Sequence, residues 1–245
     1  METLSVGRSS GEAEASPDPS WRGLYRAGGV SALLYVVLTF AIPVVLGFIT
    51  PQPASAGGVA TFAGGIATLQ FIASHGSVFI LNQALIFGPS ILAMVVFLAL
   101  YMALKHLNKS YAAIGALLAI AAAVLTLVTF SIVGGLVYLS AEYVAATTAA
   151  QRAAFTTAAE ALIAVHNAMI ADGILFTTGI LIISLVMLKG VFRKGIAYLG
   201  IVTGALGIIS EALRPILGYS YAVYGILLLI WLIAVGWKLY RLGVQ

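Results

Sequence analysis

The sequence predicts an all-α fold: a polytopic integral membrane protein whose six-helix transmembrane bundle has both termini in the cytoplasm. The first observation is composition, because 62% of the 245 residues are hydrophobic and only 8% are charged. A soluble domain carries about 25% charged residues, and a disordered chain is poor in apolar ones, so both classes are excluded. The second observation is six apolar runs near or above the ~20 residues that cross a bilayer. The third is that most basic residues flank these runs at one end.

The runs divide the chain into a tail and one domain. Residues 1–20 are rich in Ser, Gly, Glu, Asp and Pro without an apolar period, which predicts a disordered cytoplasmic tail. Residues 21–245 are expected to form a single transmembrane domain. Its helices are expected at about residues 27–49, 78–104, 111–139, 162–188, 195–213 and 219–237.

The first run invites comparison with a signal peptide. Arg22 and Arg26 precede it, and Ala54-Ser55-Ala56 imitates a cleavage site of small residues. A signal peptide has an apolar core of about 7 to 15 residues, whereas this run has about 22. An uncleaved first helix is therefore the favoured interpretation.

Two segments between the spans are expected to lie at the outer membrane interface. In residues 57–73, apolar side chains recur at helical spacing, interrupted by Gly64 and Gly65. Residues 141–160 are rich in Ala and Thr, which favours a helix in water or along the headgroups. Both segments would cap the outer end of the bundle.

The basic residues set the expected orientation. With six spans and an inside N-terminus, only Arg152 and Arg214 fall outside. The ten inside are Arg8, Arg22, Arg26, Lys105, Lys109, Lys189, Arg193, Lys194, Lys238 and Arg241. This bias predicts cytoplasmic termini. Since these charges flank apolar runs instead of forming a basic face, the bilayer and not a nucleic acid is the expected partner.

Polar residues inside the spans are the candidates for function, because they are costly in hydrocarbon. Asp172 lies 17 positions from Lys189, and Glu211 lies 17 positions from Lys194. At a rise of ~1.5 Å per residue, both carboxylates stand ~25 Å above the inner boundary. Other polar groups collect at or above that depth. The candidate ligand-binding residues are Asp172, Glu211, Arg214, His166, Asn167, Asn82, Gln83 and Tyr221.

Each candidate also has a purely structural interpretation. Glu211 and Arg214 are three positions apart, which suits a local ion pair. Asn82 and Gln83 suit hydrogen bonds between helices, and His166 suits a solvated group near the headgroups. Tyrosines of the last run, Tyr224 among them, suit anchors at the membrane interface.

Two further patterns concern packing and symmetry. Gly200 and Gly204 form a small-residue ridge, which predicts close helix packing and a face for homo- or hetero-oligomers. A shift of 84 positions lays Asn82-Gln83 on His166-Asn167 and Lys105 on Lys189, so an internal repeat in one orientation is a hypothesis.

Several chemistries are excluded by residue counts. The chain has no Cys, which removes disulfides and thiolate chemistry, and its three His are scattered along it. A phosphate-binding glycine loop is absent as well. No catalytic residue, metal or cofactor is predicted. The leading hypothesis is a non-enzymatic protein that binds a small or lipid-like ligand in its outer half. The alternatives are an enzyme acting on a lipid or isoprenoid, with Asp172 or His166 as base, and a structural or accessory subunit.

Three stretches carry a family resemblance. They are FLALYMALKHLNKSYAAIGALLAI, LFTTGILIISLVMLKGVFRKGIAYLGIVTGALGIISEALRP and YAVYGILLLIWLIAVGWKLYRL. The chain resembles the bacterial six-helix membrane proteins grouped as domain of unknown function 4386, over about Arg22 to Leu242. The shared features are a basic turn, a glycine-bearing helix after it and a last helix that contains tryptophan. The resemblance implies a bacterial cytoplasmic membrane protein and assigns no catalytic residue.

Overall fold

The structure is a computed structural model that describes residues 19–49, 64–168, 171–190, 192–217 and 223–245. Every regular element in these ranges is helical, as the composition predicts. The expected tail lies outside the described residues except for its last two. The elements are η1 (Pro19–Trp21), α1 (Arg22–Ile49), α2 (Gly65–Phe87), α3 (Pro89–Leu104), α4 (Lys109–Ala145), α5 (Ala149–Ala168), α6 (Ala171–Met187), α7 (Lys194–Ala212), α8 (Arg214–Leu217) and α9 (Val223–Val244).

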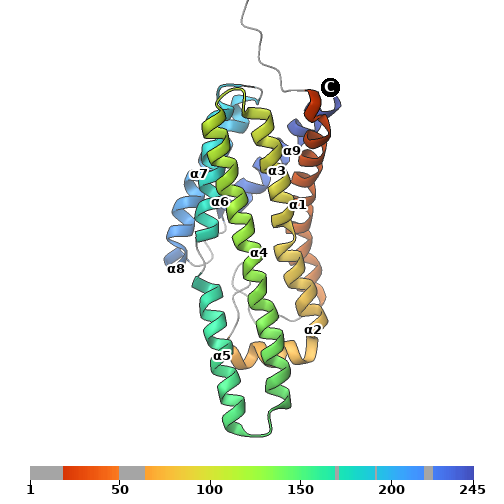
Figure 1. Ribbon diagram of the computed structural model, residues 1–245, viewed down its shortest axis with the longest axis vertical. Helices are drawn as coiled ribbons and strands as arrows, with labels where there is room; N and C mark the ends of the chain where they lie inside the picture. The colour runs from red at the N-terminus through yellow and green to blue at the C-terminus, as the bar shows by residue number, and fades with distance from the viewer. Residues whose placement is uncertain (1–18, 50–63, 169–170, 191, 218–222) are drawn as a thin grey trace, which may run out of the picture.

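Six of the described helices form a closed ring. Each of α1, α3, α4, α6 and α7 packs against the next, and α9 packs against α7 and returns to α1 (Figure 1). Two of these neighbouring pairs, α3 with α4 and α6 with α7, are joined by short connections, which favour antiparallel packing.

Aromatic side chains fill the centre of this ring. Phe97 of α3 lies 5.4 Å from Phe176 of α6 and 6.3 Å from Trp231 of α9, measured between ring centroids. Phe97 and Trp231 are fully buried. Three helices that are not consecutive in the chain are thus joined by ring contacts at separations that aromatic pairs favour.

The two ends of the described chain meet at one end of the bundle (Figure 1). Nε of Arg26 in α1 donates to the carbonyl oxygen of Gly243 in α9, at 2.7 Å. The turns after α3 and after α6 lie at this same end. We call it the basic end, because it carries Arg22, Arg26, Lys105, Lys109, Lys189, Arg193, Lys194, Lys238 and Arg241. The opposite end is called the acidic end.

The segment after the first expected span contains a helix that crosses the bundle. α2 bends at His75, whose φ of −137° and ψ of 36° are not helical, and its first part lies across α4 and α5 (Figure 1). There Leu69 is fully buried and its carbonyl accepts from Oγ of Ser140 at 2.8 Å. Gly64, with φ of 113°, precedes this helix, so the two glycines mark its start. Residues 57–63 of the expected segment lie outside the described residues.

The second expected interfacial segment, 141–160, forms the tip of a helical hairpin. α4 continues to Ala145, and α5 starts at Ala149. The amide nitrogens of Thr147 and Thr148 donate to Oε1 of Gln151 at 3.1 and 3.2 Å, which fixes the turn. Ala has the highest helix propensity, so both helices extend up to this turn.

One of the expected long helices is divided. Residues 78–104 are shared between α2 and α3, and the division falls at Gly88 and Pro89. Pro89 takes the first position of α3, where a missing amide hydrogen costs nothing. The expected helix 162–188 corresponds to the end of α5 and to α6, with residues 169–170 outside the described ranges.

Among the described residues, five helical segments are long and apolar enough to cross a membrane. They are Gly65–Leu104, Lys109–Ala145, Ala149–Met187, Lys194–Ala212 and Val223–Val244.

Candidate functional site

Asp172 is anchored at the start of α6 by two hydrogen bonds. Its Oδ1 accepts from the amide nitrogen of Gly173 at 2.9 Å, and its Oδ2 accepts from Oγ1 of Thr126 in α4 at 3.0 Å. The first turn of a helix carries a partial positive charge, so an acidic residue is favoured there. The Thr126 contact ties this carboxylate to the neighbouring helix.

Glu211 of α7 lies against the start of α6, next to Asp172. It is 4% exposed, and its carboxylate lies directly against the backbone of Gly173. A Cβ atom at position 173 would stand 2.7 Å from Oε2 of Glu211, so the approach needs glycine. The two carboxylates therefore lie at one level of the bundle.

Two further side chains contact Glu211. Oη of Tyr224 in α9 donates to its Oε1, and a guanidinium nitrogen of Arg214 lies 3.7 Å from its Oε2. The ion pair predicted from sequence is present, and it is largely buried, since the side chains are 5% and 23% exposed. Tyr224 was expected to be an interface anchor, and the structure adds that its hydroxyl binds Glu211.

We refer to Thr126, Asp172, Glu211, Arg214 and Tyr224 as the carboxylate cluster. It joins α4, α6, α7, α8 and α9 where α6 begins, α7 ends and α9 begins. α4 and α5 continue beyond this level (Figure 1). The cluster thus closes one side of the ring at its acidic end.

The other predicted site residues lie elsewhere or outside the description. Asn82 and Gln83 are buried, at 9% and 2% exposure, on α2, which packs mainly against α4 and α5. His166 is half-buried in the last turn of α5. The side chain of Asn167 and all of Tyr221 lie outside the described residues. The structure gathers three of the eight predicted residues, Asp172, Glu211 and Arg214, in the carboxylate cluster.

The cluster has residues that sequence reasoning missed. Thr126 lies on the predicted third span without any charged neighbour along the helix, and its role depends on a contact 46 positions away. Tyr224 was noticed only as one of several tyrosines. No pattern within one helix distinguishes either residue.

The glycine ridge of α7 packs inside the chain. Additional Cβ atoms at Gly200 and Gly204 would collide with Ser184 and Leu181 of α6. Gly200 also faces Trp231 of α9. This face is therefore taken by the bundle's own helices, and an oligomer would need another surface.

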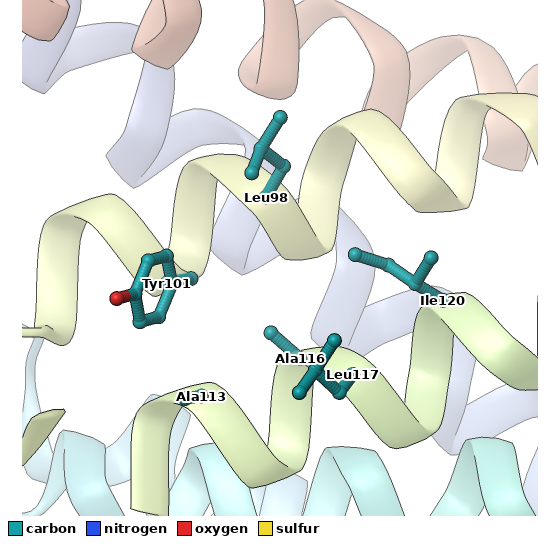
Figure 2. A pocket seen from close by; sticks show the side chains of 6 residues that line it. All are labelled: Leu98, Tyr101, Ala113, Ala116, Leu117 and Ile120. Atoms are coloured by element: carbon teal, nitrogen blue, oxygen red, sulfur yellow. The ribbon is translucent and has the colours of Figure 1, made fainter. Parts of the chain in front are cut away.

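Figure 2 shows a groove between α3 and α4 of about 290 Å³. Leu98 and Tyr101 of α3 face α4, and the hydroxyl of Tyr101 is the one polar side-chain atom among the labelled residues (Figure 2). Leu117 is 64% exposed, so the groove opens outward. The α4 lining residues are Ala113, Ala116, Leu117 and Ile120. They lie within three turns of Lys109, nearer the basic end than Thr126, so this groove is not the predicted outer pocket.

The described part of the chain contains no set of three or more His, Asp or Glu side chains that could hold a metal ion. His75 instead stacks on Phe71, with ring centroids 5.1 Å apart, and its Nδ1 lies 2.8 Å from Oγ of Ser74.

A ring of long apolar helices around an aromatic core, with charges gathered at its two ends, defines the class of helical membrane proteins. Within that class, the chain belongs to the family of the domain of unknown function DUF4386, whose model matches residues 37–237. The resemblance seen in the sequence is thereby confirmed, over a range slightly shorter than the one expected. No curated protein and no solved structure matches the chain.

Proposed function

We propose that the chain forms a single domain that spans the bacterial cytoplasmic membrane six times, with both termini in the cytoplasm. α1 supplies the sixth span, because it has 28 residues and closes the ring between α3 and α9. The basic end would face the cytoplasm, where positively charged loops are retained. The shared end of the two termini supports an even number of spans.

Within that frame, we propose that the protein is not an enzyme and binds a small amphiphile with a cationic head at the carboxylate cluster. The observation that carries the proposal is charge balance. Asp172 and Glu211 lie on either side of Gly173, whereas one cation, Arg214, forms the ion pair among the described residues. An uncompensated carboxylate is costly at membrane depth, and a cationic head would offset it.

Charge at the acidic end as a whole supports the same ligand class. From residue 19 onward the sequence has four acidic residues, Glu142, Glu160, Asp172 and Glu211, and all lie toward this end. The basic residues there are Arg152 and Arg214. Arg152 donates from Nε and Nη2 to the carbonyl oxygen of Ala146 at the hairpin tip. The field of this end therefore favours a cation.

A ligand could reach the cluster at Asp172 and Arg214, which are its two partly exposed members. Glu211 is buried, but Asp172 is only half-buried and the side chain of Arg214 keeps 23% of its surface exposed. A ligand would thus contact Asp172 with a donor while Glu211 stays paired with Tyr224 and Arg214. Its apolar tail would lie along the helices toward the membrane.

The experiment compares two amphiphiles that differ in head charge only. Dodecylamine and dodecanol are added to the purified protein in nanodiscs, and the melting temperature is measured. We expect dodecylamine to raise it and dodecanol to leave it unchanged, and Asp172→Asn to abolish the rise. Glu142→Gln removes an acidic charge from α4 at the same end and serves as the matched control, with the rise retained.

The proposal fails on any of three results. Dodecylamine without effect on the unaltered protein would make the cluster a purely structural tie between helices. Equal shifts from the amine and the alcohol would show that head charge is irrelevant. Equal losses in Asp172→Asn and Glu142→Gln would assign the effect to overall charge at the acidic end.

A further inference from the structure

A second groove opens at the basic end, between the start of α4 and the end of α6. It has a volume of about 420 Å³ and lies far along both helices from the carboxylate cluster. The lining residues are Asn108, Tyr111, Ile182, Leu185, Val186, Leu188 and Lys189. The proposed function does not involve this groove.

The apolar wall of the groove is one face of α6. Ile182 and Leu185 are three positions apart, which places them in line along the helix, and Lys189 lies in the turn that follows it. Val186, 4% exposed, forms the floor. Leu185 is 48% exposed and Tyr111 is 58% exposed, so the groove is open toward the surface that faces the bilayer.

The polar residues lie together at the end of the wall. Lys189 is exposed directly after α6, and Asn108 stands immediately before α4. Oδ1 of Asn108 accepts from the amide nitrogen of Tyr111 at 3.1 Å, which holds the carboxamide at the groove. Its NH2 group supplies two further donors. The groove therefore has an apolar length and a cationic, hydrogen-bond-donating end.

The surroundings of that end are basic. Residues 105–109 and 189–194 contain Lys105, Lys109, Lys189, Arg193 and Lys194 and no acidic residue. Lys105 lies over the ring of Trp21, 5.4 Å from its centroid, on the side of α1 and η1. The α3–α4 groove of Figure 2 offers a useful contrast, because its lining has no charged residue.

We propose that the α4–α6 groove binds one anionic phospholipid from the membrane leaflet at the basic end. An acyl chain would lie along Ile182 and Leu185, and the phosphate would meet Lys189 and the Asn108 amide. Charge complementarity selects the anionic headgroup, and the apolar wall selects a membrane lipid over a soluble phosphate. The site is independent of the amphiphile proposed at the acidic end.

The test is lipid retention. Protein is released into the gas phase from nanodiscs with equal phosphatidylglycerol and phosphatidylcholine, and bound lipids are counted by native mass spectrometry. We expect one phosphatidylglycerol retained in preference to phosphatidylcholine. Lys189→Gln should weaken this preference about fivefold, the effect of one basic residue near an anionic surface. Lys238→Gln at the same end, on α9, is the matched control and should preserve the preference.

A second variant tests the groove itself. Leu185→Trp fills the apolar wall while keeping every charge, and it should reduce retention of the phosphatidylglycerol. Because Leu185 faces the bilayer, the fold should tolerate the larger ring, which an unchanged melting temperature would verify. Added glycerol phosphate should not displace the lipid.

Contrary outcomes are equally definite. If Lys189→Gln and Lys238→Gln reduce the preference alike, the effect belongs to the basic end in general and the site is refuted. If Leu185→Trp has no effect, or glycerol phosphate displaces the lipid, the groove contributes nothing and a headgroup or a free phosphate binds alone. Either result overturns the proposal.

Discussion

Gly173 is the residue on which the carboxylate cluster depends. Its missing side chain allows the carboxylate of Glu211 to rest on the backbone of α6, next to Asp172. In a helix, glycine is less favourable than alanine by about 0.5–1 kcal/mol, so its presence here is explained by the approach it permits.

Replacement of this glycine gives the first prediction. Gly173→Ala should destabilise the protein by about 1–3 kcal/mol, because the methyl group forces α6 and α7 apart. Gly134→Ala is the control, since nothing lies within 4 Å of a Cβ at that helical position. That variant should gain stability, as alanine does in helices. Unfolding in detergent micelles measures both, and shifts of the same sign would contradict the packing described.

The hydrogen bond from Thr126 to Asp172 gives the second prediction. Thr126→Val keeps the shape of the side chain and removes the donor, so the free energy of unfolding should fall by about 1 kcal/mol, a usual value for such bonds between membrane helices. Thr157→Val is the control, because that hydroxyl is exposed and donates to the carbonyl of Ala153 in its own helix. Equal effects in the two variants would mean that the bond contributes nothing.

At this scale the sequence supplies the acidic residues and the ion pair of Glu211 with Arg214, but not the hydroxyl partners. Asp172 and Glu211 could be predicted because charges are rare in apolar runs and because counting from Lys189 and Lys194 gives their depths. Thr126 could not be, since threonine is common in membrane helices and only the crossing of α4 with α6 selects it. A hydroxyl partner can be identified only when it is known which face each helix turns toward its neighbour.

At the scale of elements, the turns at the basic end recur along the chain. α4 begins at residue 109 and α7 begins at residue 194, each directly after a short basic turn. This offset of 85 positions is close to the 84 that aligns the polar dipeptides. The internal repeat stays a hypothesis.

The first part of α2 is held by one charged contact. The amide nitrogen of Gly65 donates to Oε1 of Glu160 in α5 at 2.6 Å, and the residue before it, Gly64, has no side chain to cap the helix. A carboxylate at a helix N-terminus satisfies a free amide and favours the helix dipole. The crossing helix is therefore attached to the hairpin through Glu160.

Removal of that carboxylate gives the third prediction. Glu160→Ala should speed hydrogen exchange of the first-turn amides of α2 about tenfold, the consequence of losing a cap of about 1–2 kcal/mol. Glu142→Ala, which removes an acidic residue of α4 at the same end, should leave those amides unchanged. Exchange measured by mass spectrometry on peptides covering residues 65–74 decides the matter, and unaltered exchange in Glu160→Ala would refute the capping role.

At the scale of the whole molecule, the chain separates two hydrophobic cores. One fills the ring and includes Phe97 and Trp231, and the other lies toward the acidic end beneath the crossing helix, around Leu69 and Leu136. The carboxylate cluster stands where α6 and α9 begin and α7 ends, while α4 and α5 continue beyond this level (Figure 1). The all-helical fold class followed from composition and apolar runs. The packing of α5 beside α4 and the division of one span at Gly88 and Pro89 did not, because they depend on packing between segments.

Charge is the other property of the whole molecule. The basic end carries the lysines and arginines that flank the helices, and the acidic end carries all four acidic residues from position 19 onward. This separation suits a fixed orientation in a membrane and different ligands at the two ends. It also makes the carboxylate cluster the point where charge, burial and access coincide.

The most direct test is an experimental structure of the protein in lipid nanodiscs, with density examined beside Asp172 and Arg214. We predict that Asp172 and Glu211 line one cavity open toward the acidic end, and that density of an amphiphile contacts Asp172. Carboxylates that point apart, or a cluster enclosed by protein groups with no density beside it, would contradict a ligand site there.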